Sequence, residues 1–224
     1  MLIDGKTGQV IPAEGLPARL TIKKLRPKLD QRTILVGATG TGKTTLARHL
    51  LRPIKPLIVI DSKCTYGGKG GEPGFEMVSN PRRLQGLRAS VDYIQYRPDE
   101  NHQTVADYDE VYKWVYRRGG IFCYTDEAFL VHHGSYAPDW LRACVTCGRE
   151  LGIGMMHGTQ RPRGIDLRLM TEAEVFISFD LRHRDDRKRM AEMGGDEFME
   201  RPPQHAFWVW RAGDRNPVLA RLKL

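Results

Sequence analysis

The sequence is poor in the features that mark secreted and membrane proteins. It has only 4 cysteines among 224 residues, which fits a reducing compartment and argues against a small secreted domain held by disulfides. No stretch approaches the ~20 uninterrupted apolar residues of a membrane-spanning helix. The first residues also lack the basic and apolar regions of a signal peptide. We therefore expect a cytoplasmic protein with no transmembrane segment of its own.

Acidic side chains are in the minority. The chain has 27 Asp and Glu against 35 Lys and Arg, a formal net charge of +8. This balance favours an acidic partner, with nucleic acid as the leading candidate, although net charge alone speaks only of non-specific attraction. The charge is therefore supporting information and does not identify a function.

A complete metal-binding set is also missing. Cys144 and Cys147 have the CxxC spacing, and His132 and His133 lie upstream. No second CxxC and no HxxxH completes a tetrahedral zinc site, and the two cysteines fall in a segment that favours a helix. We therefore interpret them as helix cysteines in the core rather than as metal ligands.

What the chain does contain is a complete phosphate-binding loop, GxxxxGK[ST], at residues 37–44. It lies between an apolar run at 33–36 and a helix-forming stretch at 45–51. Its glycines let backbone N–H groups surround phosphates, and the following helix directs the positive end of its dipole at the same anions. Lys43 would contact the β- and γ-phosphates of a nucleoside triphosphate, and Thr44 would hold Mg²⁺. The residues predicted to bind the nucleotide are Gly37, Thr39, Gly40, Thr41, Gly42, Lys43, Thr44 and Thr45.

An acidic pair, Asp126 and Glu127, follows an apolar and β-prone run at 121–125. A buried parallel strand here would present both carboxylates at its C-terminal end, where open α/β sheets bind ligands. Asp126 is placed to orient the hydration shell of Mg²⁺, and Glu127 to polarise the attacking water. A nucleotide switch or a small-molecule kinase would not need the second carboxylate, so the pair predicts hydrolysis.

Strand-like runs alternate with stretches of helical periodicity between residues 31 and 200, among them predicted helices at 104–118 and 138–151. This alternation predicts an α/β fold, with a doubly wound and mainly parallel sheet in a P-loop ATPase core. Residues 1–30 contain two strand-like runs separated by Gly and Pro, one between residues 2 and 11 and one at 18–22, which predict a small β appendage. Residues 201–224 predict a C-terminal β-hairpin packed on the core. Both termini should therefore add antiparallel strands.

Three further segments carry a resemblance to a known family. Residues 58–63 are similar to its "IDPK" strand end, with Ser62 in place of proline. Residues 149–162 are similar to its "R-x-x-G-I-H … A-T-Q-R-P" segment, with glycines at the positions of His and Ala. Residues 175–179 and the charged tail after them resemble its downstream strand. The segments follow one another in the order found in that family. Over roughly residues 30–190, the chain resembles the FtsK/HerA superfamily of ring-shaped DNA translocases.

Within this superfamily, the small size and the lack of a separate DNA-reading domain look most like the genome-packaging ATPases of tailless icosahedral viruses with an internal membrane. The resemblance implies a RecA/FtsK-like core that hydrolyses ATP with Mg²⁺ and pumps double-stranded DNA. It implies a homo-oligomeric ring, a hexamer or a pentamer, that docks on a capsid vertex or on a portal or membrane protein. The implied locations are the host cytoplasm and the packaging vertex of the virion.

The resemblance also implies roles for individual residues. Gln160 would sense the γ-phosphate from the end of its strand. An arginine would reach into the site of the neighbouring subunit and stabilise charge that develops during hydrolysis. Arg149 is the first choice on motif position, and the alternatives are Arg161, Arg163 and Arg182.

Candidate DNA contacts are basic or aromatic-flanked positions outside the nucleotide motifs. They are Lys69 in a Gly-rich loop, Arg82, Arg83, His132 and His133. Each of them is also explained as an ordinary solvated surface group.

Two other functions stay open at this point. A cellular DNA pump, or an assembly and export ATPase of filamentous phages, would keep the motor and change its cargo or place. A P-loop protein that uses ATP as a conformational switch would translocate nothing. Glu127 and Gln160 argue against the switch, because a switch needs neither a water activator nor a γ-phosphate sensor.

Overall fold

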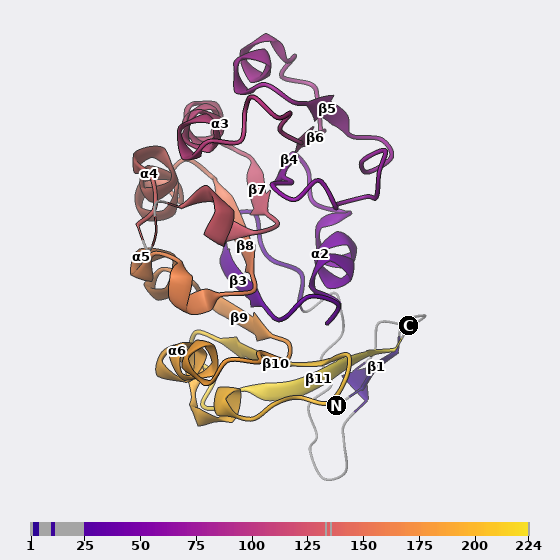
Figure 1. Cartoon of the computed structure of the whole chain (residues 1–224), viewed down its shortest axis with the longest axis vertical. Helices are drawn as coiled ribbons and strands as arrows, with labels where there is room; N and C mark the ends of the chain where they lie inside the picture. Colours follow the sequence, from indigo (N-terminus) through magenta and orange to yellow (C-terminus); the bar gives the residue numbers. More distant parts are fainter. Residues whose placement is uncertain (1, 5–9, 12–24, 133, 135, 224) are drawn as a thin grey trace.

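The computed structural model describes residues 2–4, 10–11, 25–132, 134 and 136–223. Its centre is one sheet of eleven strands with helices on both faces, in the order β2-β1-β11-β10-β9-β3-β8-β7-β4-β6-β5 (Figure 1). The strands are β1 (Leu2–Asp4), β2 (Val10–Ile11), β3 (Arg32–Val36), β4 (Leu57–Ile60), β5 (Glu76–Val78), β6 (Tyr93–Tyr96), β7 (Phe122–Thr125), β8 (Gly154–Thr159), β9 (Val175–Ser178), β10 (Ala206–Arg211) and β11 (Val218–Lys223). The helices are α2 (Lys43–Leu51), α3 (Val105–Arg118), α4 (Asp139–Cys147), α5 (Leu167–Thr171) and α6 (Arg184–Gly194), with short 3₁₀ turns η1 (Pro81–Gly86), η2 (Ala128–Val131), η3 (Pro162–Gly164) and η4 (Asp196–Met199).

The sheet has a parallel centre and an antiparallel end. The seven strands from β9 to β5 in this order are all parallel to one another. Strand β10 is antiparallel to both β9 and β11, β1 pairs parallel with β11, and β2 is antiparallel to β1. The predicted fold class, a mainly parallel α/β sheet with antiparallel additions, is therefore confirmed. The strand-like run predicted at 18–22 lies outside the described residues, and the division into units at 1–30, 31–200 and 201–224 stays a prediction.

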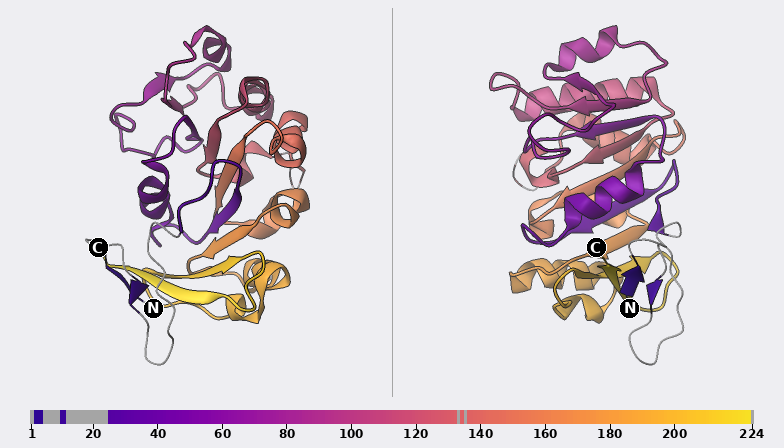
Figure 2. Two further views of the ribbon diagram at one scale, coloured as in Figure 1. Left: turned by 180° about the vertical axis from the view of Figure 1, so that it is seen from behind. Right: turned by 90° about the vertical axis from the view of Figure 1, so that its right-hand side faces the viewer.

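The central strands are apolar throughout because both of their faces are covered. Alternate residues point to opposite faces of a strand, so Ile58 and Ile60 enter one core and Leu57 and Val59 enter the other. Helix α2 covers the second core, while α3 and α4 cover the first (Figure 2). This double cover leaves the ends of the strands as the open part of the sheet.

Helices α3 and α4 show where sequence signals fix a helix end. Thr104 and Asp107 form a reciprocal capping box at the start of α3, and this helix agrees with the predicted one at 104–118. Helix α4 ends at Cys147, earlier than the predicted end at 151. The chain turns instead through Gly148 and Gly152, and Gly152 has a left-handed φ of 67° that favours glycine.

Helix α4 contains both cysteines of the CxxC pair, Cys144 and Cys147. Cys144 is buried as predicted, whereas Cys147 is exposed at the end of the helix, so the prediction that both cysteines lie in the core is wrong for Cys147. Among the described residues, no helix combines the length and the apolar character that crossing a bilayer would need.

Candidate active site

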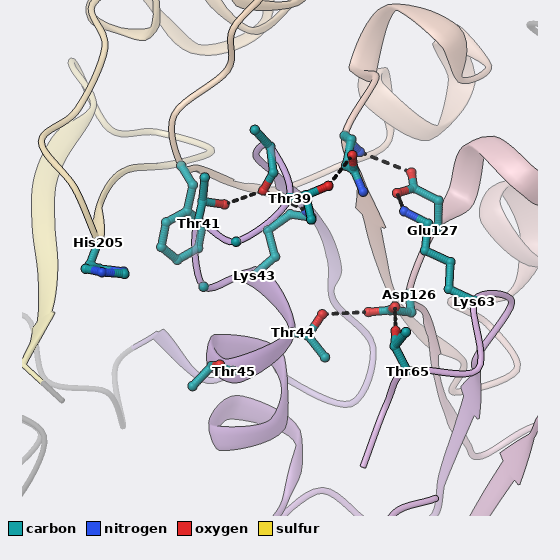
Figure 3. Close-up of a pocket in the computed structure, with 15 residues that line it drawn as sticks. Thr39, Thr41, Lys43, Thr44, Thr45, Lys63, Thr65, Asp126, Glu127 and His205 are labelled. Atoms are coloured by element: carbon teal, nitrogen blue, oxygen red, sulfur yellow. Dashed lines mark hydrogen bonds and ion pairs between the residues drawn. The ribbon is translucent and has the colours of Figure 1, made fainter. Parts of the chain in front are cut away.

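The predicted nucleotide motifs meet at one edge of the sheet. The phosphate loop follows β3, Gln160 follows β8, and Asp126 and Glu127 follow β7, and these three parallel strands are neighbours. The carboxyl ends of these strands lie at the same edge of the sheet, so the motifs that follow them lie side by side. The side chains line a cavity of about 590 Å³ (Figure 3).

Two close approaches explain why the phosphate loop needs glycine. A Cβ on Gly37 would lie 2.5 Å from Cβ of Phe179, and the φ of Gly37 is 153°. Gly42 caps helix α2 with a φ of 105° in the left-handed region. The loop can therefore curve against β9 and still direct the start of the nine-residue helix α2 toward the cavity.

Lys43 is the buried cation of the cavity. The residue is only 8% exposed, and Nζ donates a hydrogen bond of 2.7 Å to the carbonyl oxygen of Gly37. Burial lowers the pKa of this ammonium group, and the nearby Glu127 opposes the shift. A buried ammonium that is held by backbone carbonyls is in position to receive the phosphate groups of a ligand.

Thr44 and Asp126 bring two oxygen donors together. Thr44 Oγ1 donates to Asp126 Oδ1 at 3.2 Å, and the hydroxyl of Tyr124 donates to the same oxygen at 2.8 Å. Burial raises the pKa of Asp126, and these hydrogen bonds counteract the shift. Mg²⁺ prefers hard oxygen ligands and is usually held by one or two protein groups plus water and phosphate oxygens. The residues present therefore fit this ion.

Glu127 is held on both of its carboxylate oxygens. Oε2 forms an ion pair of 2.6 Å with Nζ of Lys63, and Oε1 accepts a hydrogen bond of 3.1 Å from the backbone N–H of Gln160. The side-chain oxygen of Gln160 in turn accepts a 2.9 Å hydrogen bond from Thr39 Oγ1. A chain of contacts therefore joins the phosphate loop, the end of β8 and the end of β7.

Sequence reasoning assigned no role to Lys63. It follows the end of β4, which pairs parallel with β7, so the ends of the two strands lie at the same edge. Adjacent parallel strand ends are the signal that would have found this contact. Phe179 and His205 also line the cavity. The contribution of His205 depends on a loop from the far end of the chain, for which the sequence holds no motif.

Three of the predicted DNA contacts lie at the surface. Lys69 is exposed in the Gly-rich loop after β4, and the carbonyl oxygens of Lys69 and Gly68 accept hydrogen bonds from Arg97. Arg82 and Arg83 are exposed on η1, which packs beside β5 at the end of the sheet far from β10 (Figure 1). Their contact with DNA stays a prediction.

The prediction for His132 needs a correction. The residue is 6% exposed, Nδ1 contacts the carbonyl oxygen of Ala128, and burial lowers the pKa of the imidazole. A neutral ring in the interior cannot pair with a phosphate, so we remove His132 from the candidate DNA contacts. His133 lies outside the described residues.

The structure does not bring Arg149 to the site of its own chain. Arg149 precedes β8 and Gln160 follows it, so the six residues of the strand, roughly 20 Å, separate the two edges. Arg149 forms a 2.9 Å ion pair with Glu174 at the far edge. The alternatives Arg161, Arg163 and Arg182 are exposed and follow the carboxyl ends of β8 and β9, at the edge that holds the phosphate loop. Which of them acts toward a neighbouring subunit stays a prediction.

No protein-family model and no curated protein sequence matches the chain. Several solved structures do match. The genome-packaging NTPase B204 from Sulfolobus turreted icosahedral virus 2, in complex with AMPPCP, matches with 17% identity and a TM-score of 0.67, over 88% of this chain and 100% of B204. The sulfate complex of B204 gives a TM-score of 0.70. The pCW3 conjugation coupling protein TcpA matches with 15% identity and a TM-score of 0.56, over 97% of this chain and 66% of TcpA.

These likenesses establish the fold. The chain has a P-loop NTPase fold, and the predicted resemblance to viral packaging ATPases is confirmed at the level of the architecture. B204 was solved with nucleotide analogues, among them AMPPCP and ATP-γS.

Proposed function

We propose that this chain is an ATP hydrolase that uses Mg²⁺ and drives the translocation of double-stranded DNA. The observation that carries the proposal is the convergence of Lys43, the Thr44–Asp126 pair and Glu127 around one cavity at the carboxyl edge of the sheet. The phosphate loop alone would support binding. Glu127 and its contact with Gln160 add the groups that hydrolysis requires.

Each residue has a separate task in this mechanism. Lys43 binds between the β- and γ-phosphates, while Thr44 and Asp126 would hold Mg²⁺, which neutralises the charge of the phosphate oxygens when it is bound. Glu127 accepts a proton from the attacking water, and Gln160 orients the γ-phosphate or that water. The reaction then consists mainly of positioning and charge stabilisation, which this compact cluster supplies.

Lys63 lies in the same segment as Lys69, a predicted DNA contact in the Gly-rich loop, and so links this loop to the candidate active site. Lys63 holds Oε2 of Glu127 in an ion pair of 2.6 Å, and we infer that this contact restrains the carboxylate from turning toward the attacking water. Lys63 belongs to the segment after β4 that also contains Thr65, whose hydroxyl donates to Asp126 at 3.5 Å, and the exposed Lys69. DNA that binds at Lys69 would therefore pull on the segment that restrains Glu127.

The translocation part rests on charge and on fold likeness. The net charge of +8 attracts a polyanion, and exposed Lys69, Arg82 and Arg83 offer phosphate contacts that do not depend on base sequence. B204 is described as a genome-packaging NTPase and TcpA as a conjugation coupling protein, which favours a DNA cargo. We extend the proposal to packaging of a viral genome by a homo-oligomeric ring, a hexamer or a pentamer, in the host cytoplasm and at the capsid vertex, docked on a portal or membrane protein.

ATP turnover with and without double-stranded DNA tests the proposal. The parent chain should hydrolyse ATP, and DNA should accelerate it. Glu127→Gln keeps the nucleotide and metal ligands, so it should bind ATP normally and lose roughly 10²- to 10⁴-fold in turnover. Very slow hydrolysis that DNA does not change would favour the conformational switch instead.

The viral and cellular alternatives share this biochemistry and need a different observation. A gene for a major capsid protein beside the gene for this chain would support packaging. Neighbouring genes for filamentous-phage assembly, or for cell division or conjugation, would favour export or a cellular DNA pump.

A further inference from the structure

The side of the cavity opposite to the carboxylates is lined by His205, a residue from near the end of the chain. His205 lines the same cavity as Asp126, Glu127 and Lys63. In Figure 3, the phosphate-loop residues lie between His205 on one side and these three residues on the other. The cavity thus has an acidic end and an imidazole end, with the phosphate loop between them.

The loop that carries His205 is fixed at both ends. Arg201 donates two hydrogen bonds to the carboxylate of Asp180, from Nε at 2.7 Å and from Nη2 at 2.6 Å. At the other end, the carbonyl oxygen of Gln204 accepts hydrogen bonds from Nε and Nη2 of Arg221, at 3.2 and 3.0 Å. Two consecutive prolines, at 202 and 203, restrict the backbone between these anchors. The wall is therefore built before any ligand arrives.

His205 itself adopts an unusual backbone conformation. Its φ is 60°, in the left-handed region that residues other than glycine seldom adopt. Its side chain is exposed at the cavity rather than packed in the core. Residues held in such conformations gather at ligand sites, where a fixed loop can support the strain. The conformation points to a ligand as the reason for this placement.

The direction of a bound triphosphate identifies the part of the ligand that meets His205. Its γ-phosphate must lie toward Glu127, where the water is activated, and its phosphate chain follows the loop to the start of α2 at Thr44 and Thr45. The bound nucleoside must then extend toward the side of the cavity that is away from Glu127. Thr45 and His205 line the cavity on that side (Figure 3). A second cavity of about 410 Å³, between the phosphate loop and residues 201–206, shares His205 with the first.

We propose that His205 is the nucleobase contact of this site, and that its imidazole stacks on the face of the base of a bound nucleoside triphosphate. The proposal rests on the proposed nucleotide binding and adds the element that recognises the nucleoside. Every base offers a π-face to a flat ring, so the contact raises affinity for nucleotides over bare polyphosphates without selecting strongly among bases. Purines gain most because they cover more of the ring.

Calorimetric titration with two ligands, non-hydrolysable AMPPCP and inorganic tripolyphosphate, tests the proposal on the full chain. His205→Asn tolerates the left-handed backbone but removes the aromatic ring, so it should bind AMPPCP roughly 5- to 100-fold more weakly. Its affinity for tripolyphosphate should stay within about twofold of the parent, because the phosphate loop is untouched. His205→Phe keeps a flat ring and should restore most of the AMPPCP affinity.

Lys43→Ala is the matched control, since it should weaken both ligands alike. Parent-like AMPPCP affinity in His205→Asn would overturn the nucleobase contact while leaving nucleotide binding intact. Equal losses for both ligands in that variant would also overturn it, because they would assign His205 a structural role. A parent chain that binds neither ligand would overturn the nucleotide site and this proposal together.

Discussion

The ammonium group of Lys63 lies 2.6 Å from Oε2 of Glu127. Glu127 is 3% exposed, and the backbone N–H of Gln160 occupies its other carboxylate oxygen. The proposed water activator is therefore restrained on both sides, by β4 through Lys63 and by β8 through Gln160. In the proposed mechanism this restraint keeps hydrolysis slow until the segment after β4 moves.

Lys63→Met should therefore raise ATP turnover in the absence of DNA. If opening the ion pair adds on the order of 1 kcal/mol to the activation free energy of hydrolysis, removing the pair increases the basal rate by roughly fivefold. The ratio of the rates with and without DNA should fall, and Lys63→Arg should restore it because the charge returns. Lys55→Met, which removes an exposed ion pair with Asp92, is the control and should leave both rates unchanged. A lower basal rate in Lys63→Met would mean that Lys63 assists catalysis and does not restrain Glu127.

A second prediction concerns His157 in the middle of β8. Burial lowers its pKa to about 3, and neither ring nitrogen has a hydrogen-bond partner among the described residues. The imidazole of His157 therefore stays unprotonated in the native state. In the unfolded state it binds a proton when the pH is below the ordinary histidine pKa of ~6.5. The free energy of unfolding should fall by about 1.4 kcal/mol for each pH unit below that value.

His157→Leu should remove this part of the acid sensitivity. Chemical denaturation of the parent and the variant at pH 7 and pH 4.5 measures it, and the variant should lose roughly 2 to 3 kcal/mol less between the two values. His132 is also buried with a lowered pKa and contributes in the same direction, so the parent loses more than one histidine explains. His49→Leu, an exposed position on α2, is the control. Equal pH dependence in His157→Leu and the parent would contradict the prediction.

The parts of the site that the sequence predicted are those with local motifs. The phosphate loop and the acidic pair each combine a strand end with a fixed residue pattern, so the C-terminal edge of a parallel sheet brings them together. Lys63 and His205 escaped because their positions depend on the order of strands across the sheet. Nothing in the sequence states that β4 is a neighbour of β7, or that β10 continues the sheet beside β9.

Burial was the second thing that the sequence could not state. His132 follows an acidic pair in a loop-like segment and was predicted to contact DNA, yet it faces the interior after η2. The predicted helix at 138–151 likewise ended early at Cys147, because glycines after it changed the direction of the chain. Local periodicity predicts a helix or a strand, but it does not specify which of the residues next to that element become buried in the folded protein.

The third prediction concerns DNA. If several phosphates are neutralised, log K should fall by ~0.9 per neutralised phosphate for each log unit of salt, with little preference for base sequence. Lys69→Ala, and the double substitution of Arg82 and Arg83 by alanine, should weaken binding to all sequences alike. Each substitution should also make the salt slope shallower by about one for every phosphate that is no longer neutralised. Fluorescence anisotropy over a salt series measures both effects. Sharp sequence selectivity, or binding that salt does not change, would point to a sequence reader.

The fourth prediction concerns the arginine that acts between subunits. Arg149 lies at the edge of the sheet opposite to its own phosphate loop, where it pairs with Glu174 at 2.9 Å. Arg149→Ala should bind ATP normally and hydrolyse it poorly if the arginine acts on transition-state charge in a neighbouring site. Glu174→Gln is the control that weakens the same ion pair but keeps the arginine. Equal loss of turnover in both variants would assign Arg149 a structural role in its own chain.

Mixed rings provide the sharper test of the same residue. Glu127→Gln subunits and Arg149→Ala subunits should each be inactive alone. In a mixed ring, an Arg149→Ala subunit supplies an intact Glu127, and a neighbouring Glu127→Gln subunit supplies an intact Arg149. Such an interface has a complete site, so partial hydrolysis should return, with a maximum at an intermediate mixing ratio. No recovery at any ratio, despite demonstrated co-assembly, would exclude Arg149 from this role. Arg161, Arg163 and Arg182, which lie at the edge of the phosphate loop, would then be tested in the same way.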